Sequence, residues 1–143
     1  MVTADGYLDA SFLIALLSVE RFSVDADRFV RRHSGGLMVS DFAAAEFASA
    51  IARRVRMHET TEAEARSDLS AFDDWVGRST RQVEITPVDV GLAAAYLRRL
   101  DLPLRTPDAI HIAIAQRLGA TLVTFDRQMA ESARALGTAV ATP

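Results

Sequence analysis

The stretch LRTPDAIHIAIAQRLGATLVTFDRQMA, residues 104–130, decides the fold class. It opens on Thr-Pro, which is typical of a helix start, continues as an apolar run at helical spacing, and then becomes a short β-rich run at residues 121–124. The segment also carries two acids, Asp108 at the start of the helical run and Asp126 just beyond the β-rich run. Both acids need an explanation, because most residues around them are apolar.

The same alternation of short β-rich runs and helical stretches recurs along the chain. The expected strands are Tyr7–Asp9, Leu37–Ser40, Val83–Thr86 and Thr121–Thr124, with residues 138–141 as a weak fifth edge strand. Two helices, residues 42–58 and 61–78, are expected between the second and third strands, with an N-cap at Thr60 or Thr61. Strands that alternate with helices favour a parallel α/β sheet of four to five strands. We expect one domain over residues 1–143.

Composition excludes several classes of chemistry. The 143-residue chain has no cysteine, which excludes disulfides, thiolate metal sites and cysteine nucleophiles. All sixteen basic residues are arginine, so lysine-dependent phosphate loops and Schiff bases are excluded as well. The formal charge of -3 provides no global attraction to nucleic acid, so any such binding requires a local arginine patch.

The N-terminal apolar run lacks the basic residues of a targeting segment. It is flanked and interrupted by Asp5 and Asp9, which argues against a signal peptide and against a membrane anchor. We therefore expect a soluble, cytoplasmic protein.

Two acids follow expected strands directly. In an open parallel sheet, ligands bind beyond the carboxyl ends of the strands. Asp9 ends the first strand, and Ser11 is expected to cap a helix over residues 12–18, although Asp9 itself is the alternative cap. Asp126 lies two residues beyond Thr124, where a simple N-cap is again the alternative to a site role.

Asp108 is the more informative acid. Thr106 is expected to cap the helix and Pro107 to take its first position, which places Asp108 beside free amide groups of the first turn. Asp108 shares a helix face with Ile112 and Ala115, so it should point toward the sheet. An unpaired buried carboxylate costs several kcal/mol, so a cation or strong donors must compensate it.

Glu46 raises the same question within VSDFAAAEFASAIARRVR, residues 39–56. An ion pair with Arg53, seven residues along the same face, and a role in a site are equal alternatives. We expect Asp41 to cap this helix and His111 to be a packed histidine bonded to a neighbour. The remaining acids of the helical region are expected on solvated faces: Glu62, Glu64, Asp73 and Asp74.

Four acids are therefore expected at one edge of the sheet: Asp9, Glu46, Asp108 and Asp126. Carboxylates gathered there would repel one another unless a divalent cation neutralised them. Ligands that are all oxygen suit magnesium or manganese and not zinc.

Three segments resemble the PIN-domain ribonucleases, specifically the VapC-type toxins of bacterial toxin–antitoxin pairs. They are YLDASFLIALL (residues 7–17), SDFAAAEFASAI (residues 40–51) and TPDAIHIAIAQRLGATLVTFD (residues 106–126). The resemblance implies a three-layer α/β/α fold around a parallel sheet, with Asp9, Glu46, Asp108 and Asp126 as its acidic cluster. It further implies dependence on Mg²⁺ or Mn²⁺, endonucleolytic RNA cleavage, a homodimer, and inhibition by a cognate antitoxin.

The resulting hypothesis is metal-assisted hydrolysis of RNA phosphodiesters by a toxin. Ser11 and Thr124 are predicted to orient carboxylates or water, with capping or packing as an equal alternative. Three clustered arginines, Arg53, Arg54 and Arg56, are the preferred contact with RNA or antitoxin.

The same residues bear on three other classes of protein. A non-catalytic module of the same fold that binds RNA or protein is the alternative function. A receiver domain is disfavoured because the chain has no lysine. An aspartate-nucleophile phosphatase is disfavoured because Ser11 stands where its second acid would be.

Overall fold

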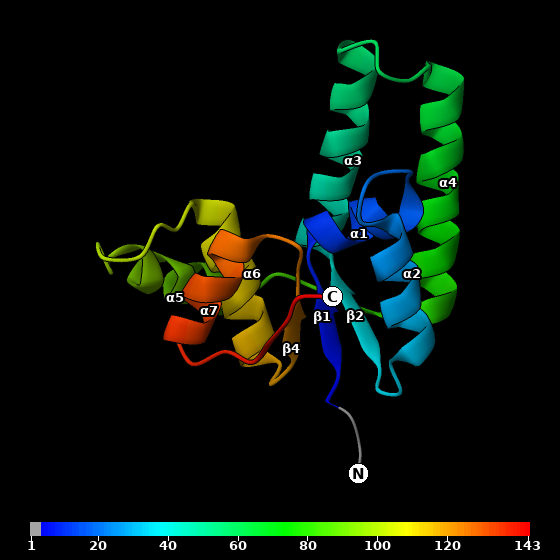
Figure 1. Cartoon of the computed structure of the whole chain (residues 1–143). Coiled ribbons are helices and arrows are strands. Elements are labelled where there is room, and N and C mark those ends of the chain that lie inside the picture. The colour runs from blue at the N-terminus through cyan, green and yellow to red at the C-terminus, as the bar shows by residue number, and fades with distance from the viewer. Residues whose placement is uncertain (1–3) are drawn as a thin grey trace.

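The computed structural model describes residues 4–143, and these form an α/β fold around one parallel sheet (Figure 1). In chain order the elements are β1 (Gly6–Leu8), α1 (Ala10–Leu17), α2 (Ser23–Arg32), β2 (Leu37–Ser40), α3 (Asp41–Arg56), α4 (Glu62–Ser79), β3 (Arg81–Val83), α5 (Pro87–Leu97), α6 (Thr106–Arg117), β4 (Thr121–Val123), α7 (Arg127–Ala135) and β5 (Val140–Ala141). The sheet has five strands in the order β3-β2-β1-β4-β5, and every neighbouring pair is parallel. The predicted fold class is confirmed.

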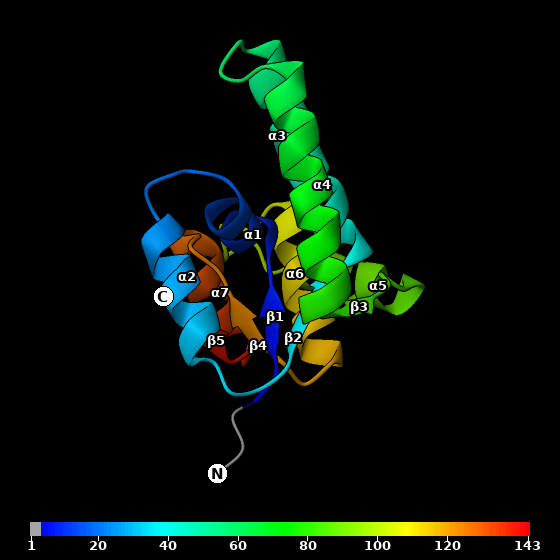
Figure 2. The same ribbon diagram turned by 90° about the vertical axis from the view of Figure 1, so that its right-hand side faces the viewer.

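Alternation along the strands divides the core between the two faces of the sheet. Tyr7, Met38 and Leu122 pack against α5, α6 and α7 on one face. Their neighbours Leu8 and Val39 pack against α1 to α4 on the other. Because successive side chains of a strand point to opposite faces, both faces are apolar and both need a helical layer. Figures 1 and 2 show the two groups of helices on either side of the sheet.

The third strand lies two residues earlier than expected. Residues 83–86 were predicted as a strand, whereas β3 is Arg81–Val83. Thr86 instead caps α5, because its side chain accepts a hydrogen bond from Asp89 N and the Asp89 side chain accepts one from Thr86 N. This capping box, followed by Pro87 at the first helical position, takes residues 84–86 out of the sheet.

At the start of α1 the alternative cap Asp9 is realised, and the cap predicted for α3 is wrong. Helix α1 begins at Ala10 and not at residue 12, because Asp9 is the N-cap and its Oδ1 accepts a 2.9 Å hydrogen bond from Phe12 N. Ser40, not Asp41, caps α3. Asp41 Oδ1 accepts a 2.8 Å hydrogen bond from Ile85 N, so this acid fastens the start of α3 to the segment after β3.

Helices α3 and α4 form a hairpin that projects from the sheet (Figures 1 and 2). The predicted cap at Thr61 is confirmed, with Glu64 completing a capping box. Phe47 and Phe72 stack between the two helices with ring centroids 4.2 Å apart. The acids expected on solvated faces are exposed, as predicted: Glu62, Glu64, Asp73 and Asp74. None of the helices within residues 4–143 is long and apolar enough to cross a membrane.

Candidate active site

Asp9 lies at the carboxyl end of β1 with only 1% of its surface exposed. Ser11 Oγ donates a 2.7 Å hydrogen bond to its Oδ1, which also accepts from Phe12 N. Thr124 Oγ1 donates a 2.5 Å hydrogen bond to Oδ2. Both carboxylate oxygens are therefore held by donors from two neighbouring strand ends, so the orientation of Asp9 is fixed.

The charge of Asp9 is only partly compensated. Burial raises the pKa of its carboxyl group, and this effect outweighs the opposing influence of His111, Thr124, Phe12 and Ser11. No arginine within residues 4–143 forms an ion pair with Asp9. A buried carboxylate without a bonded cation is a group that a metal ion would stabilise.

Asp126 lies beside this carboxylate in the hydrogen-bond network. Its N–H donates a 3.0 Å hydrogen bond to Thr124 Oγ1, the same hydroxyl that binds Asp9. Its own carboxylate caps α7, since Oδ1 accepts a 3.0 Å hydrogen bond from Met129 N. The N-cap that was the alternative to a site role for Asp126 is therefore realised.

Asp108 is buried in the first turn of α6, with 5% of its surface exposed. Its Oδ2 accepts a 3.1 Å hydrogen bond from Arg105 N and lies 3.5 Å from Arg105 Nε. Arg105 is the residue before α6, which begins at Thr106, so the prediction that Thr106 caps this helix is wrong. Pro107 consequently takes the second helical position instead of the first. The backbone N–H and the guanidinium of Arg105 are therefore the donors that were expected to compensate the buried Asp108 carboxylate.

Glu46 turns toward α6 and not along its own helix. Its Oε1 accepts a hydrogen bond from His111 Nε2, and 31% of its side chain is exposed. The alternative ion pair between Glu46 and Arg53 does not form. Seven residues span about 10.5 Å along a helix, whereas His111 lies directly beside Glu46.

His111 is buried and hydrogen-bonded at both ring nitrogens, so the prediction of a packed, bonded histidine is confirmed. Its Nδ1 lies 2.8 Å from Tyr7 Oη, which in turn lies 2.8 Å from Ser40 Oγ. Tyr7 and Ser40 were not among the residues predicted for the site. Tyr7 carries a hydroxyl on the face of β1 that packs against α6, and this was the available signal.

The structure holds the predicted acids by separate partners and does not close them into a cluster. Asp9 joins Ser11 and Thr124, Glu46 joins His111, and Asp108 and Asp126 are held by their own helix starts. Within residues 4–143, no group of three or more His, Asp or Glu side chains is arranged to hold a metal ion. The donor set nevertheless fits a hard cation, because it supplies carboxylate oxygens and includes the partly compensated Asp9.

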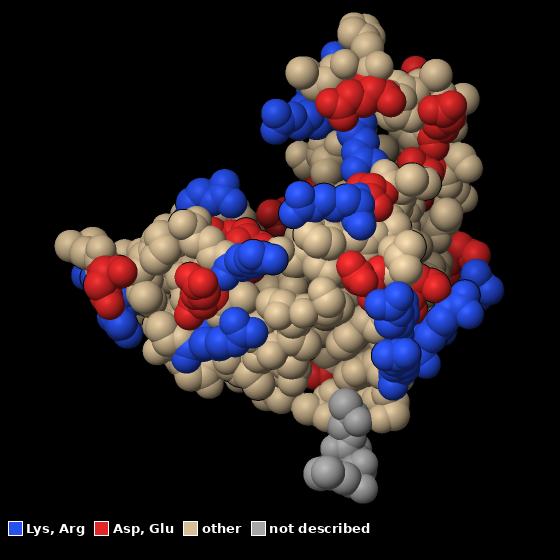
Figure 3. All heavy atoms as spheres, in the orientation of Figure 1, with Lys and Arg blue, Asp and Glu red and all other residues tan. Residues whose placement is uncertain are grey.

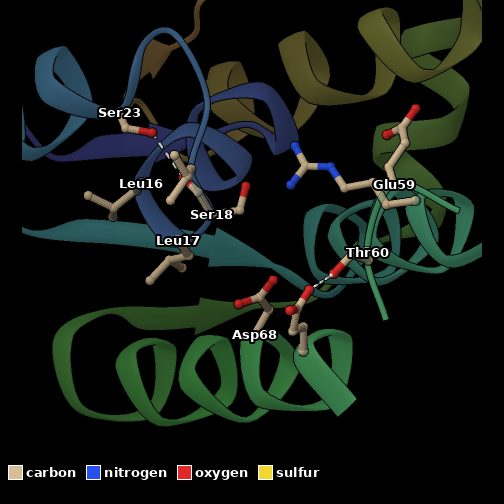
Figure 4. A pocket seen from close by; sticks show the side chains of 10 residues that line it. Leu16, Leu17, Ser18, Ser23, Glu59, Thr60 and Asp68 are labelled. Atoms are coloured by element: carbon tan, nitrogen blue, oxygen red, sulfur yellow. Dashed lines mark hydrogen bonds between the residues drawn. The ribbon is translucent and has the colours of Figure 1, made fainter. Parts of the chain in front are cut away.

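A separate hollow of 870 Å³ lies where the end of α1 faces the α3–α4 hairpin. Figure 4 shows Leu16 and Leu17 opposite Glu59 and Thr60 in this hollow. Arg54 also lines it, whereas none of the four predicted acids does. The hollow is therefore distinct from the candidate active site.

A parallel five-stranded sheet with acids beyond the ends of its central strands defines the class of this protein. A family model described as the PIN domain matches residues 6–135. The chain belongs to the PIN domain family, as the resemblance of its three segments predicted.

The comparisons with individual proteins agree with this assignment. The chain is 30% identical over 131 residues to Ribonuclease VapC3 of Pyrobaculum aerophilum, covering 92% of this chain and 96% of that protein. The structure of VapC20 from Mycobacterium tuberculosis, described as a sarcin-ricin loop cleaving toxin, has a TM-score of 0.73 at 19% identity, over 89% of this chain and 94% of that one. A toxin–antitoxin complex from Klebsiella pneumoniae has a TM-score of 0.61 at 21% identity, over 96% and 97%.

Proposed function

We propose that this protein is an endoribonuclease that hydrolyses RNA phosphodiester bonds as the toxin of a toxin–antitoxin pair. The observation that carries the proposal is the buried carboxylate of Asp9, which Ser11 and Thr124 orient and no arginine pairs. RNA is the proposed substrate because the relative of similar length, VapC3, is named a ribonuclease.

The proposed cofactor is a divalent cation, Mg²⁺ or Mn²⁺. Asp9 and Asp108 are its first ligands, with Glu46 and then Asp126 completing the set. A bound cation of this kind lowers the pKa of a water molecule and offsets charge that develops on the phosphate. The residues of the chain orient the ligands: Ser11 and Thr124 hold Asp9, and His111 holds Glu46.

The second candidate function is a module of the same fold that binds RNA or protein without cleaving RNA. It is favoured by the use of Asp108 and Asp126 in the starts of α6 and α7. In such a module these acids stabilise helices and need not meet at a metal ion.

The proposed partners are a cognate antitoxin and a second copy of the chain, in a cytoplasmic protein whose single domain spans residues 1–143. The similarity to a chain solved in a toxin–antitoxin complex supports an antitoxin. Arg54 beside Leu16 and Leu17 in the 870 Å³ hollow suits contact with a protein segment. Arg53 and Arg56 are exposed and suit contact with RNA.

The test incubates purified protein with a panel of structured RNAs in Mg²⁺, in Mn²⁺ and with a chelator. Asp9→Asn and Asp108→Asn remove proposed ligands, and Asp73→Asn is the matched control on an exposed helix face. Cleavage should require the cation and should be lost in the first two variants alone. Cleavage that persists in both would refute the assignment of these acids. A folded wild type that cuts no RNA in a broad panel would favour the binding module.

A further inference from the structure

A series of hydrogen-bonded side chains runs from the end of β2 to the candidate active site. Ser40 Oγ and Tyr7 Oη are 2.8 Å apart, Tyr7 Oη and His111 Nδ1 are 2.8 Å apart, and His111 Nε2 contacts Glu46 Oε1. Ser40, Tyr7 and His111 are at most 2% exposed, whereas the Glu46 side chain is 31% exposed. The series thus leads from the core outward to one proposed metal ligand.

Donor and acceptor rules give the series one direction. An ionised carboxylate only accepts, so His111 Nε2 carries the proton that it donates to Glu46. In a neutral imidazole the other nitrogen then accepts, and Tyr7 Oη–H donates to His111 Nδ1. Tyr7 Oη must accept from the Ser40 hydroxyl, whose oxygen accepts a 2.9 Å hydrogen bond from Ala43 N. Every polar hydrogen in the series then has an acceptor.

The reverse direction leaves a donor without an acceptor. If His111 Nδ1 donated to Tyr7, the tyrosine hydroxyl would donate to Ser40, and the Ser40 hydroxyl would have no acceptor among the described residues. An unsatisfied buried donor destabilises the folded state, so this arrangement is disfavoured. Burial also raises the pKa of Tyr7 above its ordinary value, so this residue remains a hydroxyl and can donate.

We propose that His111 is a positioning residue that holds the Glu46 carboxylate at the acidic edge of the sheet, and that Tyr7 fixes the Nε2–H tautomer which makes this possible. The proposal rests on the proposed function, in which Glu46 is a metal ligand. Its chemistry is that of an outer residue that orients a ligand by one hydrogen bond.

Packing holds the imidazole in the orientation that this role requires. The Phe42 ring meets the His111 ring edge-on at 5.2 Å between centroids, and the Tyr7 ring lies at 5.7 Å. A glutamate side chain of this exposure would otherwise sample several rotamers, and ordering it would cost conformational entropy. A fixed N–H donor reduces that cost before any ligand binds.

The first experiment reads the tautomer directly by ¹⁵N NMR of the three imidazoles at mildly alkaline pH, where a free imidazole is neutral. Wild-type His111 should show the Nε2–H tautomer alone. Tyr7→Phe keeps the ring and removes the hydroxyl, so His111 should become a mixture of tautomers. A wild type with the Nδ1–H tautomer, or a Tyr7→Phe variant without change, would overturn the proposal. Neither of these two NMR measurements depends on RNA cleavage.

The second experiment compares two amides that mimic different ring nitrogens. In His111→Gln the side-chain NH₂ reaches the position of Nε2 and still donates to Glu46, whereas in His111→Asn it reaches only the position of Nδ1. Calorimetric titration with Mn²⁺ should show an affinity about 10-fold or more lower for the Asn variant. The Gln variant should recover most of this loss. His58→Asn, at an exposed position with a φ of 57°, is the control.

The His111→Gln and His111→Asn variants distinguish a positioning role of His111 from a role in packing alone. Equal loss of Mn²⁺ affinity in His111→Gln and His111→Asn, with melting temperatures lowered in parallel, would refute positioning. A wild type that binds no Mn²⁺ would instead refute the proposed function. In that case the tautomer of His111 still decides whether Tyr7 controls its donor.

Discussion

Thr124 lies 115 residues from Asp9 in the sequence, and its hydroxyl donates a 2.5 Å hydrogen bond to Asp9 Oδ2. The same Oγ1 accepts a hydrogen bond from Asp126 N. We predict that Thr124→Val, which keeps the shape and removes the hydroxyl, lowers the free energy of unfolding by about 1–3 kcal/mol. The cause is loss of a donor to a buried carboxylate. Urea denaturation followed by circular dichroism measures it.

Thr124→Ser is the control for this first prediction, because it retains the hydroxyl and removes only a methyl group. It should retain most of the cleavage activity, whereas Thr124→Val should lose it. Equal activity in the two variants would show that the hydroxyl does not orient Asp9 for the reaction.

Ionised Asp9 should cost stability at neutral pH. Burial leaves its pKa above the ordinary value, despite the opposing influence of His111, Thr124, Phe12 and Ser11. The folded state therefore binds more protons than the unfolded state between the two pKa values, and stability falls as the pH rises through that interval. We predict that Asp9→Asn abolishes cleavage while raising the free energy of unfolding at pH 7 by about 1 kcal/mol or more. Denaturation curves between acid and neutral pH would show the difference shrinking as pH falls.

A divalent cation should stabilise the folded protein by mass action. A ligand at 100 times its dissociation constant adds about 2.7 kcal/mol when it binds only the folded state. We therefore predict that Mn²⁺ raises the melting temperature of the wild type and of Asp73→Asn. Asp9→Asn should show no such rise. A rise of the same size in Asp9→Asn would place the ion elsewhere.

Sequence patterns located the elements better than their ends. Residues 37–40 were predicted as a strand and are β2, because the apolar run Leu37–Val39 is buried in the sheet and Ser40 caps α3 only where the strand ends. Residues 83–86 failed because Thr86 has a stronger use as the cap of α5. The cap predicted at Thr106 failed because Asp108 accepts a hydrogen bond from Arg105 N, so that α6 begins at Thr106 itself. At α1 the alternative cap Asp9 is realised, since its carboxylate accepts a hydrogen bond from Phe12 N.

The residues of the candidate site differ in the same way: local patterns predicted some of them, and others depend on how distant elements pack. The four acids were recognisable from local spacing, because Asp9, Asp108 and Asp126 follow a strand or start a helix and Glu46 lies early in α3. The partner of Glu46 was not, since choosing His111 over Arg53 depends on how α6 packs beside α3. Tyr7 and Ser40 were missed because the Ser40 hydroxyl meets Tyr7, and the Tyr7 hydroxyl meets His111, only after three distant segments fold together.

The ion pair between buried Asp89 and partly exposed Arg117 should stabilise the fold away from the site. Arg117 Nε and Nη2 lie 2.7 Å and 3.0 Å from the two Asp89 oxygens. Burial alone would raise the pKa of Asp89, but hydrogen bonds from Arg117 and Thr86 outweigh it and hold the pKa below its ordinary value. This contribution is present at neutral pH and is lost as the pH falls through the folded-state pKa.

We predict that Arg117→Met lowers the free energy of unfolding by about 1–3 kcal/mol, because it removes the guanidinium partner of the Asp89 carboxylate. In Asp89→Asn, the decline of stability in acid should be shallower than in the wild type. Guanidinium denaturation at neutral and acid pH measures both. An Arg117→Met variant as stable as the wild type would contradict the prediction.

The arginines at the end of α3 should contribute to RNA binding through charge alone. Arg53 and Arg56 are exposed, and within residues 4–143 neither forms an ion pair. Figure 3 shows basic side chains on the projecting hairpin with acidic side chains beside them. Any electrostatic attraction between RNA and these arginines must therefore be local, because the whole chain carries a formal charge of -3.

We predict that Arg53→Glu weakens binding of a single-stranded RNA and makes binding less sensitive to salt. Each phosphate contact contributes about 0.7 to the slope of log affinity against log salt, so the slope should fall by about that amount. Arg66→Glu is the matched control, because Arg66 is also exposed but is paired with Glu62 at 2.7 Å on the neighbouring helix. Fluorescence anisotropy at several salt concentrations, with catalytically inactive Asp9→Asn as background, measures both slopes. Indistinguishable slopes would show that net charge matters and the position of Arg53 does not, which would shift the assignment of this cluster from RNA to a protein partner.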